Sequence, residues 1–217
     1  MPTLTVRPSY WLAIAALTLV GCTGLPKAPH STVRYDLGSM PVLTAAAENL
    51  PAVALAPMQA PLWTDSSTSV RYRLAYADAQ VLYTYGQARW SMPPSAMIQQ
   101  RIREYLGQGG RVVLSAETGE IPPLVQGRQV PILRLSLEEF SQVFRSPQES
   151  DAWVRVRATL VNPTPQGDVL LAQRTFEVRK PTMTADAPGG VQALAQAVNE
   201  VGQQMQPWLQ TVLPAPR

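Results

Sequence analysis

Residues 154–178 read VRVRATLVNPTPQGDVLLAQRTFEV, and this stretch decides the fold. In its first half, apolar residues on one face alternate with polar residues on the other: Val154, Val156, Ala158 and Leu160 against Arg155, Arg157 and Thr159. The turn-forming segment NPTPQGD, residues 162–168, then leads into a second extended run at 169–178. Two long extended runs joined by a short turn predict an antiparallel hairpin. We therefore expect a mixed, largely antiparallel sheet.

Shorter segments upstream also predict strands. They share an alternating or short apolar pattern bounded by glycine, proline or polar residues, and they cover residues 33–37, 52–56, 70–76, 81–85, 112–114 and 133–137. The clearest is VRYRLAY, residues 70–76. It places Val70, Tyr72, Leu74 and Tyr76 on one face and Arg71 and Arg73 on the other. This alternation is typical of a half-buried strand.

Two segments have the periodicity of amphipathic helices. The first follows the paired Pro93 and Pro94, carries apolar residues at Ile98, Ile102, Tyr105 and Leu106, and meets glycines from position 107 onward. The second begins near Pro188 and repeats apolar residues at Val191, Leu194, Val198, Val201, Met205 and Trp208. Pro207 should end or bend it. The sequence predicts one α/β (α+β) domain with two main helices packed on one sheet.

Composition limits the chemistry of the chain. Its 217 residues, 46% of them hydrophobic, suffice for one sizeable core. A formal net charge of +3 from scattered lysines and arginines argues against a nucleic-acid partner. The only histidine, His30, lies in an irregular segment, and no glycine-rich phosphate loop precedes a helix. We therefore expect no catalytic residue, no metal site and no cofactor.

The N-terminus indicates export. An apolar run at residues 10–20 ends in Gly21 and Cys22, and Cys22 is the only cysteine in the chain. The run has the length of a secretory signal rather than of a membrane-spanning helix. The stretch around Cys22 resembles the bacterial lipobox, which implies cleavage before Cys22 and attachment of diacylglycerol and a palmitate-type acyl chain. A buried free cysteine after an ordinary signal is the alternative.

These signals divide the chain into three parts. We expect a lipoprotein signal peptide at residues 1–21, a flexible tether from the acylated cysteine at 22–32, and the folded domain at 33–211. Thr23 directly follows the expected acylated cysteine. In the lipoprotein-sorting pattern that this N-terminus resembles, aspartate at that position favours retention in the inner membrane. This resemblance favours the periplasmic face of the outer membrane in the cell envelope.

Charged and aromatic pairs suggest surfaces and packing. Arg71, Arg73, Arg155 and Arg157 could form one stripe that binds phosphate headgroups or an acidic partner, or could form a solvated sheet face. The adjacent Glu138 and Glu139 should point to opposite faces of a strand. Phe140 and Phe144 are expected to pack rather than to bind a ligand.

Several stretches together resemble the ABC-type transport auxiliary lipoprotein component family, which includes the paraquat-inducible C lipoprotein. They are RYDLG (34–38), PLWTDSSTSVRYRL (61–74), YGQARWSMPPSAMIQQRI (85–102), LEEFSQVF (137–144), RATL (157–160) and RTF (174–176). The most specific motif has five residues: Tyr85, Arg89, Trp90, Pro93 and Pro94. Gly86, Gln87 and Ala88 depart from the common form of the motif.

The resemblance implies a non-enzymatic, membrane-anchored auxiliary lipoprotein. It would act as a docking adaptor in lipid transport, with a periplasmic mammalian-cell-entry (MCE) domain protein and ABC transporter subunits as partners, and it allows a homo-oligomer. An alternative is a periplasmic carrier that holds a lipid acyl chain in a pocket of its own. A third, an envelope hydrolase, would need clustered carboxylates of raised pKa.

Overall fold

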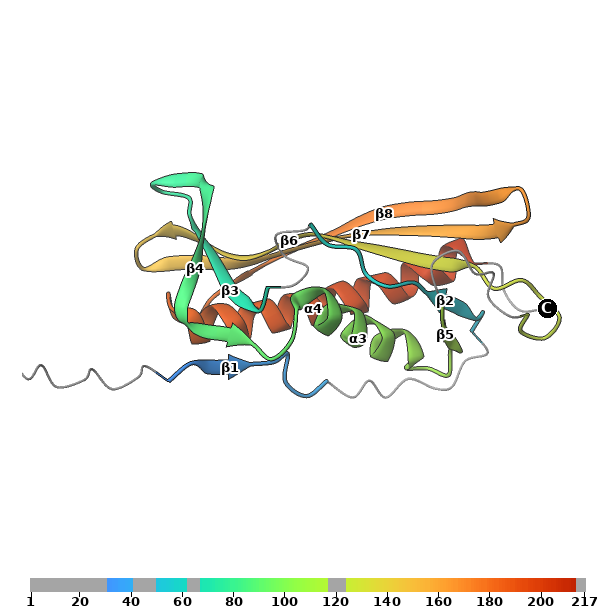
Figure 1. Ribbon diagram of the computed structural model, residues 1–217, viewed down its shortest axis with the longest axis horizontal. Helices are drawn as coiled ribbons and strands as arrows, with labels where there is room; N and C mark the ends of the chain where they lie inside the picture. The colour runs from blue at the N-terminus through green and yellow to red at the C-terminus, as the bar shows by residue number, and fades with distance from the viewer. Residues whose placement is uncertain (1–30, 41–49, 62–66, 117–123, 214–217) are drawn as a thin grey trace, which may run out of the picture. The chain divides into compact units, whose positions relative to one another are not determined.

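The computed structural model describes residues 31–40, 50–61, 67–116 and 124–213 (Figure 1). The chain separates into two units, residues 1–31 and 32–217, and all the described helices and strands belong to the second. The expected signal peptide, Cys22 and His30 lie outside the described residues, as does most of the expected tether.

Within these ranges, eight strands form one mixed sheet, and two helices accompany it. The strands are β1 (Val33–Tyr35), β2 (Val53–Leu55), β3 (Ser69–Leu74), β4 (Asp78–Trp90), β5 (Val113–Ser115), β6 (Ile132–Ser146), β7 (Glu149–Thr164) and β8 (Gly167–Pro181). The helices are α3 (Pro94–Gly107) and α4 (Ala187–Val212). Each segment predicted as a strand or helix has a counterpart here, and the single α+β fold is confirmed.

Strand β6 organises the sheet. Along one edge it pairs antiparallel with β7 over its whole length, and β7 pairs antiparallel with β8. Along the other edge it pairs parallel with β3 at one end, where Tyr72 lies opposite Gln142, and with β2 at the other, where Ala54 lies opposite Ile132. The predicted hairpin at 154–178 is therefore confirmed as part of a larger β6–β7–β8 meander.

Strand β6 is longer than its sequence pattern predicts. In the β6–β7 ladder, Leu137 lies opposite Val156 and Glu139 lies opposite Arg155. Glu138 is therefore an extra residue in β6 with no partner position in β7. Such a bulge shifts the alternation of apolar and polar residues by one position. The segment 137–144 therefore lacks the regular pattern by which the strand could be recognised, and the tight β6–β7 turn went unpredicted.

Of the two outcomes expected at Pro207, an end or a bend of helix α4, the structure excludes the end. Pro207 does not end the helix, which continues to Val212. A proline inside a helix removes one hydrogen bond and costs about 3 kcal/mol. The last turns are nevertheless held, because Trp208, Leu209 and Leu213 are buried in the core. Burial of these side chains offsets the cost of the proline.

The interior between the helices and the sheet is filled. α4 contacts β6, β7, β8 and α3, and Figure 1 shows it running alongside the long strands. The side chains that meet there have no exposed surface: Ile98, Ile102, Tyr105, Leu106, Val154, Val156, Leu194, Val198, Val201 and Met205. At the helix crossing, a Cβ on Gly202 would lie 2.5 Å from the Tyr105 ring. Only glycine lets α3 and α4 approach this closely.

Candidate functional site

The five motif residues lie at the corner where β4 passes into α3. The Trp90 ring packs against Phe140 with centroids 5.2 Å apart, and its backbone N–H donates to the Thr68 carbonyl at 2.6 Å. The next residue, Ser91, donates its N–H to the Tyr35 carbonyl at 2.7 Å. Trp90 thus anchors a corner that joins β1, the residues before β3, and β6.

The two motif prolines start α3. Pro93 is the N-cap residue, and its carbonyl accepts the backbone N–H groups of Ala96 and Met97 at 3.1 and 3.2 Å. Pro94 occupies the first turn, where its missing N–H costs no helical hydrogen bond. The predicted role of the prolines as a helix start is confirmed.

Arg89 and Tyr85 connect the corner to the sheet. The Arg89 guanidinium donates from Nη1 to the carbonyls of Tyr85 and Ala88, at 2.6 and 2.8 Å. The Tyr85 hydroxyl donates to Gln142 Oε1 at 2.9 Å. Burial raises the pKa of this hydroxyl far above the ordinary tyrosine value, with Tyr72 and Asp186 adding to the shift. Tyr85 therefore stays a neutral hydrogen-bond donor.

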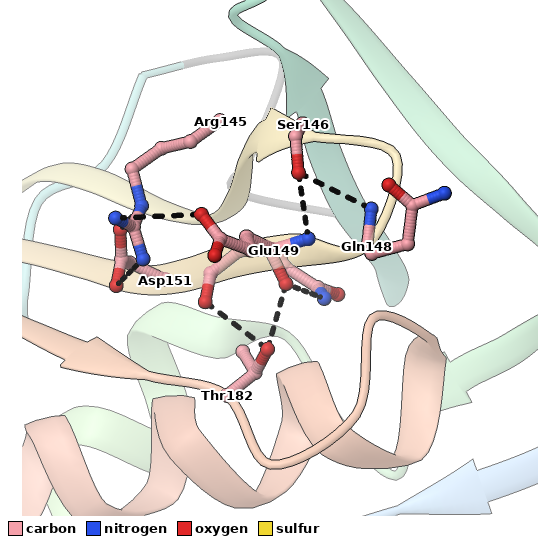
Figure 2. Close-up of polar contacts among 8 residues, drawn as sticks. Arg145, Ser146, Gln148, Glu149, Asp151 and Thr182 are labelled. Atoms are coloured by element: carbon pink, nitrogen blue, oxygen red, sulfur yellow. Dashed lines mark hydrogen bonds and ion pairs between the residues drawn. The ribbon is translucent and has the colours of Figure 1, made fainter.

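From Gln142 a buried polar network continues to the start of α4. Gln142 Nε2 donates to Ser150 Oγ at 2.7 Å, and Ser150 Oγ lies 2.7 Å from Thr182 Oγ1. Thr182 also donates its backbone N–H to the Ser150 carbonyl at 2.9 Å, and Figure 2 shows Thr182 directed at this part of β7. A Cβ on Gly190 would lie 2.0 Å from Gln142 Oε1. The network therefore fixes where α4 meets β6 and β7.

Above this network, the β6–β7 turn carries a cluster of charges (Figure 2). Ser146 Oγ accepts the N–H of Glu149 at 3.1 Å, and Arg145 Nε lies 2.7 Å from Asp151 Oδ2 and its Nη1 3.9 Å from Glu149 Oε2. Arg145 and Glu149 are exposed, so each ion pair contributes about 1 kcal/mol or less. Nothing in the sequence pattern pointed to this turn or to the Gln142 network.

The four predicted surface arginines occupy different environments. Arg155 Nε lies 2.8 Å from Glu138 Oε2, and Arg157 forms an ion pair with the same carboxylate. Arg73 Nη2 instead lies 3.0 Å from Glu139 Oε2. The adjacent glutamates therefore bind arginines of different strands.

Arg71 departs from the expected alternation in β3, because it is buried together with Val70. Desolvation lowers the pKa of its guanidinium, while the nearby Glu139 carboxylate raises it. Arg155 and Arg157 are the more exposed of the four arginines. A role in binding anions stays a prediction for those two residues.

The described residues contain no group of three or more histidine, cysteine, aspartate or glutamate side chains that could hold a metal ion. None of the described helices has the length and apolar character needed to cross a membrane. Phe140 and Phe144 pack against Trp90 and Tyr72, as predicted.

Two groups of exposed apolar side chains stand out among the described residues. We call the first the β8 edge: Val169, Leu170 and Leu171, which are 53, 61 and 44% exposed on a strand that pairs only with β7. We call the second the arm: the β3–β4 hairpin from Leu74 to Gly86. The β8 edge lies where Thr164 pairs with Gly167, and the arm joins β6 near Gln142, at the other end of β7.

Comparison with known proteins identifies one family and several solved structures that are similar to this chain. A family model described as "ABC-type transport auxiliary lipoprotein component" matches residues 35–206. The crystal structure of protein XCC0632 from Xanthomonas campestris is 19% identical, with a TM-score of 0.62, covering 84% of this chain and 94% of that one. None of the curated proteins matches the sequence.

Two further solved structures are similar. A crystal structure of an uncharacterized protein is 13% identical, with a TM-score of 0.60, covering 82% of this chain and 99% of that one. The hypothetical protein CT253 from Chlamydia trachomatis is 10% identical, with a TM-score of 0.47, covering 75% and 99%. At these identities, the structures at TM-scores of 0.62 and 0.60 show a shared fold and nothing more.

Proposed function

The chain belongs to the ABC-type transport auxiliary lipoprotein component family, and we propose that it is a non-enzymatic docking adaptor. In this proposal it is anchored through Cys22 at the periplasmic face of the outer membrane. Its partners are an MCE-domain periplasmic protein and the associated ABC transporter subunits. It supports lipid transfer by holding these partners rather than by carrying lipid itself.

The filled interior is the observation that carries this proposal. Ligand pockets for molecules of lipid size enclose some hundreds of cubic ångströms, about 300–1,000 Å³. The side chains of both helices and of β7 that face one another, among them Ile102, Val156 and Val198, have no exposed surface. An acyl chain between them would have to displace packed core residues. This favours an adaptor over the alternative of a lipid carrier.

The same packing disfavours the hydrolase alternative. The acidic side chains nearest the sheet centre, Glu138 and Glu139, are each engaged by arginines. The arrangement therefore supports a structural role for these residues.

The β8 edge supplies a surface on which a partner could dock. An edge strand presents backbone N–H and C=O groups that pair readily with another extended chain. Three consecutive aliphatic side chains next to such an edge add an apolar contact. We assign this surface to an extended segment of the MCE-domain partner.

The tether supports that assignment. The expected tether ends at β1, which pairs with β4 at the arm end of the domain. The Thr164 end of β7 lies about 40 Å away from the Asp151 end, at about 3.3 Å per residue. A lipid anchor joined near β1 would leave the β8 edge directed away from the membrane and toward the periplasm.

The proposal is tested by capturing the lipoprotein from gently solubilised envelopes through a C-terminal tag. We expect an MCE-domain protein and transporter subunits to co-purify. The Cys22→Ala variant should lose the membrane fraction and recover less of the complex. A monomer that carries stoichiometric lipid and none of these partners would refute the adaptor and favour the carrier.

A further inference from the structure

The arm has the composition of a contact surface rather than of a solvated hairpin. Its sequence, LAYADAQVLYTYG, contains one charged residue, Asp78. Tyr76, Val81 and Tyr83 on it are 49, 39 and 37% exposed. Tyr76, expected on the buried face of β3, lies instead in the turn between the strands. An exposed hairpin with so few charges and several aromatic side chains indicates a surface that is covered in the cell.

The base of the arm is braced against the sheet. The Tyr72 ring stacks on Tyr83 with centroids 5.3 Å apart, and it contacts Tyr85 and Phe144 at 4.6 and 5.8 Å. These contacts join β3 and β4 of the arm to β6. The arm is therefore a supported projection that can present its turn in a defined direction.

Hydrogen bonds from Arg73 also hold the residues that follow the turn of the arm. Arg73 Nη1 reaches the carbonyls of Ala79 and Gln80, at 3.4 Å each, while its Nη2 binds Glu139. The side chain of Arg73 thus connects β6 to the first residues of β4. Since its charge is already paired, the exposed part of the arm is aromatic and aliphatic rather than cationic.

The position of the arm points to what covers it. β1 pairs directly with β4, with Val33 opposite Ala88, so the tether of residues 22–32 meets the domain at the root of the arm. At about 3.3–3.6 Å per residue the tether reaches at most about 40 Å. From Ala88 to Asp78, β4 covers at most about 33 Å, at about 3.3 Å per residue, since its pairing with β3 is interrupted by register shifts. The arm and a lipid on Cys22 can therefore meet the same bilayer.

From these observations we propose that the arm rests on the lipid surface in which the chain is anchored. Tyrosine suits this place, because its ring enters the boundary of the acyl chains while its hydroxyl stays among the headgroups. The contact would orient the domain and keep the β8 edge away from the membrane. The inference rests on the lipid anchor of the proposed function.

The test is a fluorescent probe in the anchored lipoprotein. With Cys22 acylated, a single new cysteine at Ala77→Cys, in the arm turn, can be labelled with an environment-sensitive dye. The labelled protein is reconstituted into vesicles of phosphatidylethanolamine and phosphatidylglycerol, with and without brominated acyl chains. Gln166→Cys, in the β7–β8 turn, is the matched control. We expect bromine to reduce the emission of the arm probe and to leave the control unchanged.

A combined variant, Tyr76→Ser and Val81→Ser, which leaves the Tyr72–Tyr83 stack in place, should restore the emission of the arm probe without releasing the protein from vesicles. Equal emission from both probes on brominated vesicles would overturn the inference. So would an arm probe that changes only when a periplasmic partner protein is added. The mass of the purified chain shows independently whether Cys22 is acylated. If Cys22 is not acylated, both the lipid anchor and the inference about the arm are wrong. Docking of a partner at the β8 edge can still be tested in that case.

Discussion

Gln142 occupies the place where three parts of the fold meet, although it has no charge and is not one of the five motif residues. It accepts from Tyr85, donates to Ser150, and lies against Gly190 at the start of α4. A buried amide with both ends bonded is stabilising, whereas an amide with one end free costs about 1–3 kcal/mol. Small neighbours such as Gly190 are therefore required by the polar network.

The helix crossing at Gly202 gives the first prediction. Gly202→Ala should lower the free energy of unfolding by about 1–3 kcal/mol, because the added Cβ meets the Tyr105 ring. Helix propensity alone would make alanine more stable than glycine at this position. A lower free energy of unfolding for Gly202→Ala would therefore be due to the contact with Tyr105. Gly107→Ala is the control, since a Cβ there meets no atom within 4 Å. Urea unfolding of both variants measures the difference, and equal midpoints would contradict the close packing of α3 on α4.

The start of α4 gives a prediction that depends on pH. Asp186 accepts hydrogen bonds from the Thr184 hydroxyl at 2.7 Å and the Gly189 N–H at 2.9 Å, and these bonds lower its pKa, that from Thr184 most. Asp186→Ala should cost about 1 kcal/mol at neutral pH. Because the pKa is lower in the folded state, this difference is complete above the ordinary carboxyl pKa of about 3.9 and disappears as pH falls through the lowered value.

Urea unfolding of the wild type and Asp186→Ala, at neutral and at strongly acid pH, checks this expectation. Asp186→Asn should lie between them at neutral pH, since an amide oxygen can still accept from Gly189. A difference that persists unchanged in strong acid would show that the carboxylate charge is not what stabilises the helix start.

At the scale of elements, the helices were predictable because each carries one apolar face over several turns. α3 begins and ends where its prolines and glycines indicated. β6 was only partly predictable, because the bulge at Glu138 interrupts its alternation. The Gln142 network could not be foreseen, since Tyr85 and Thr182 are far in sequence from Gln142 and Ser150. Val169–Leu171 look like buried strand residues, and only the pairing order places them on an open edge.

Pro207 provides a prediction about α4 as an element. Pro207→Ala restores a backbone donor in the middle of a helix that the core already holds. We expect the free energy of unfolding to rise by about 1–2 kcal/mol, less than the full cost of a helical proline because the unfolded chain also gains freedom. Urea unfolding monitored by helical circular dichroism measures this. A decrease would mean that the core is shaped around the proline itself.

At the scale of the whole folded unit, residues 32–213, the exposed apolar surfaces lie at opposite ends of the long β6–β7–β8 meander. The arm lies near β1, where the tether enters, and the β8 edge lies beside the β7–β8 turn. Between them, the side chains of α3, α4 and β7 that face one another are fully buried. This arrangement suits a protein that connects a membrane to a partner.

The most direct test of the adaptor compares capture of the MCE-domain partner by the wild-type lipoprotein and by Leu170→Lys. A charge on the β8 edge should prevent strand addition while leaving the fold intact, because Leu170 is 61% exposed. Gln192→Lys adds the same charge on the exposed surface of α4 and is the matched control. The account predicts that Leu170→Lys loses the partner and Gln192→Lys retains it. Equal recovery of the partner by both variants would contradict docking at the β8 edge.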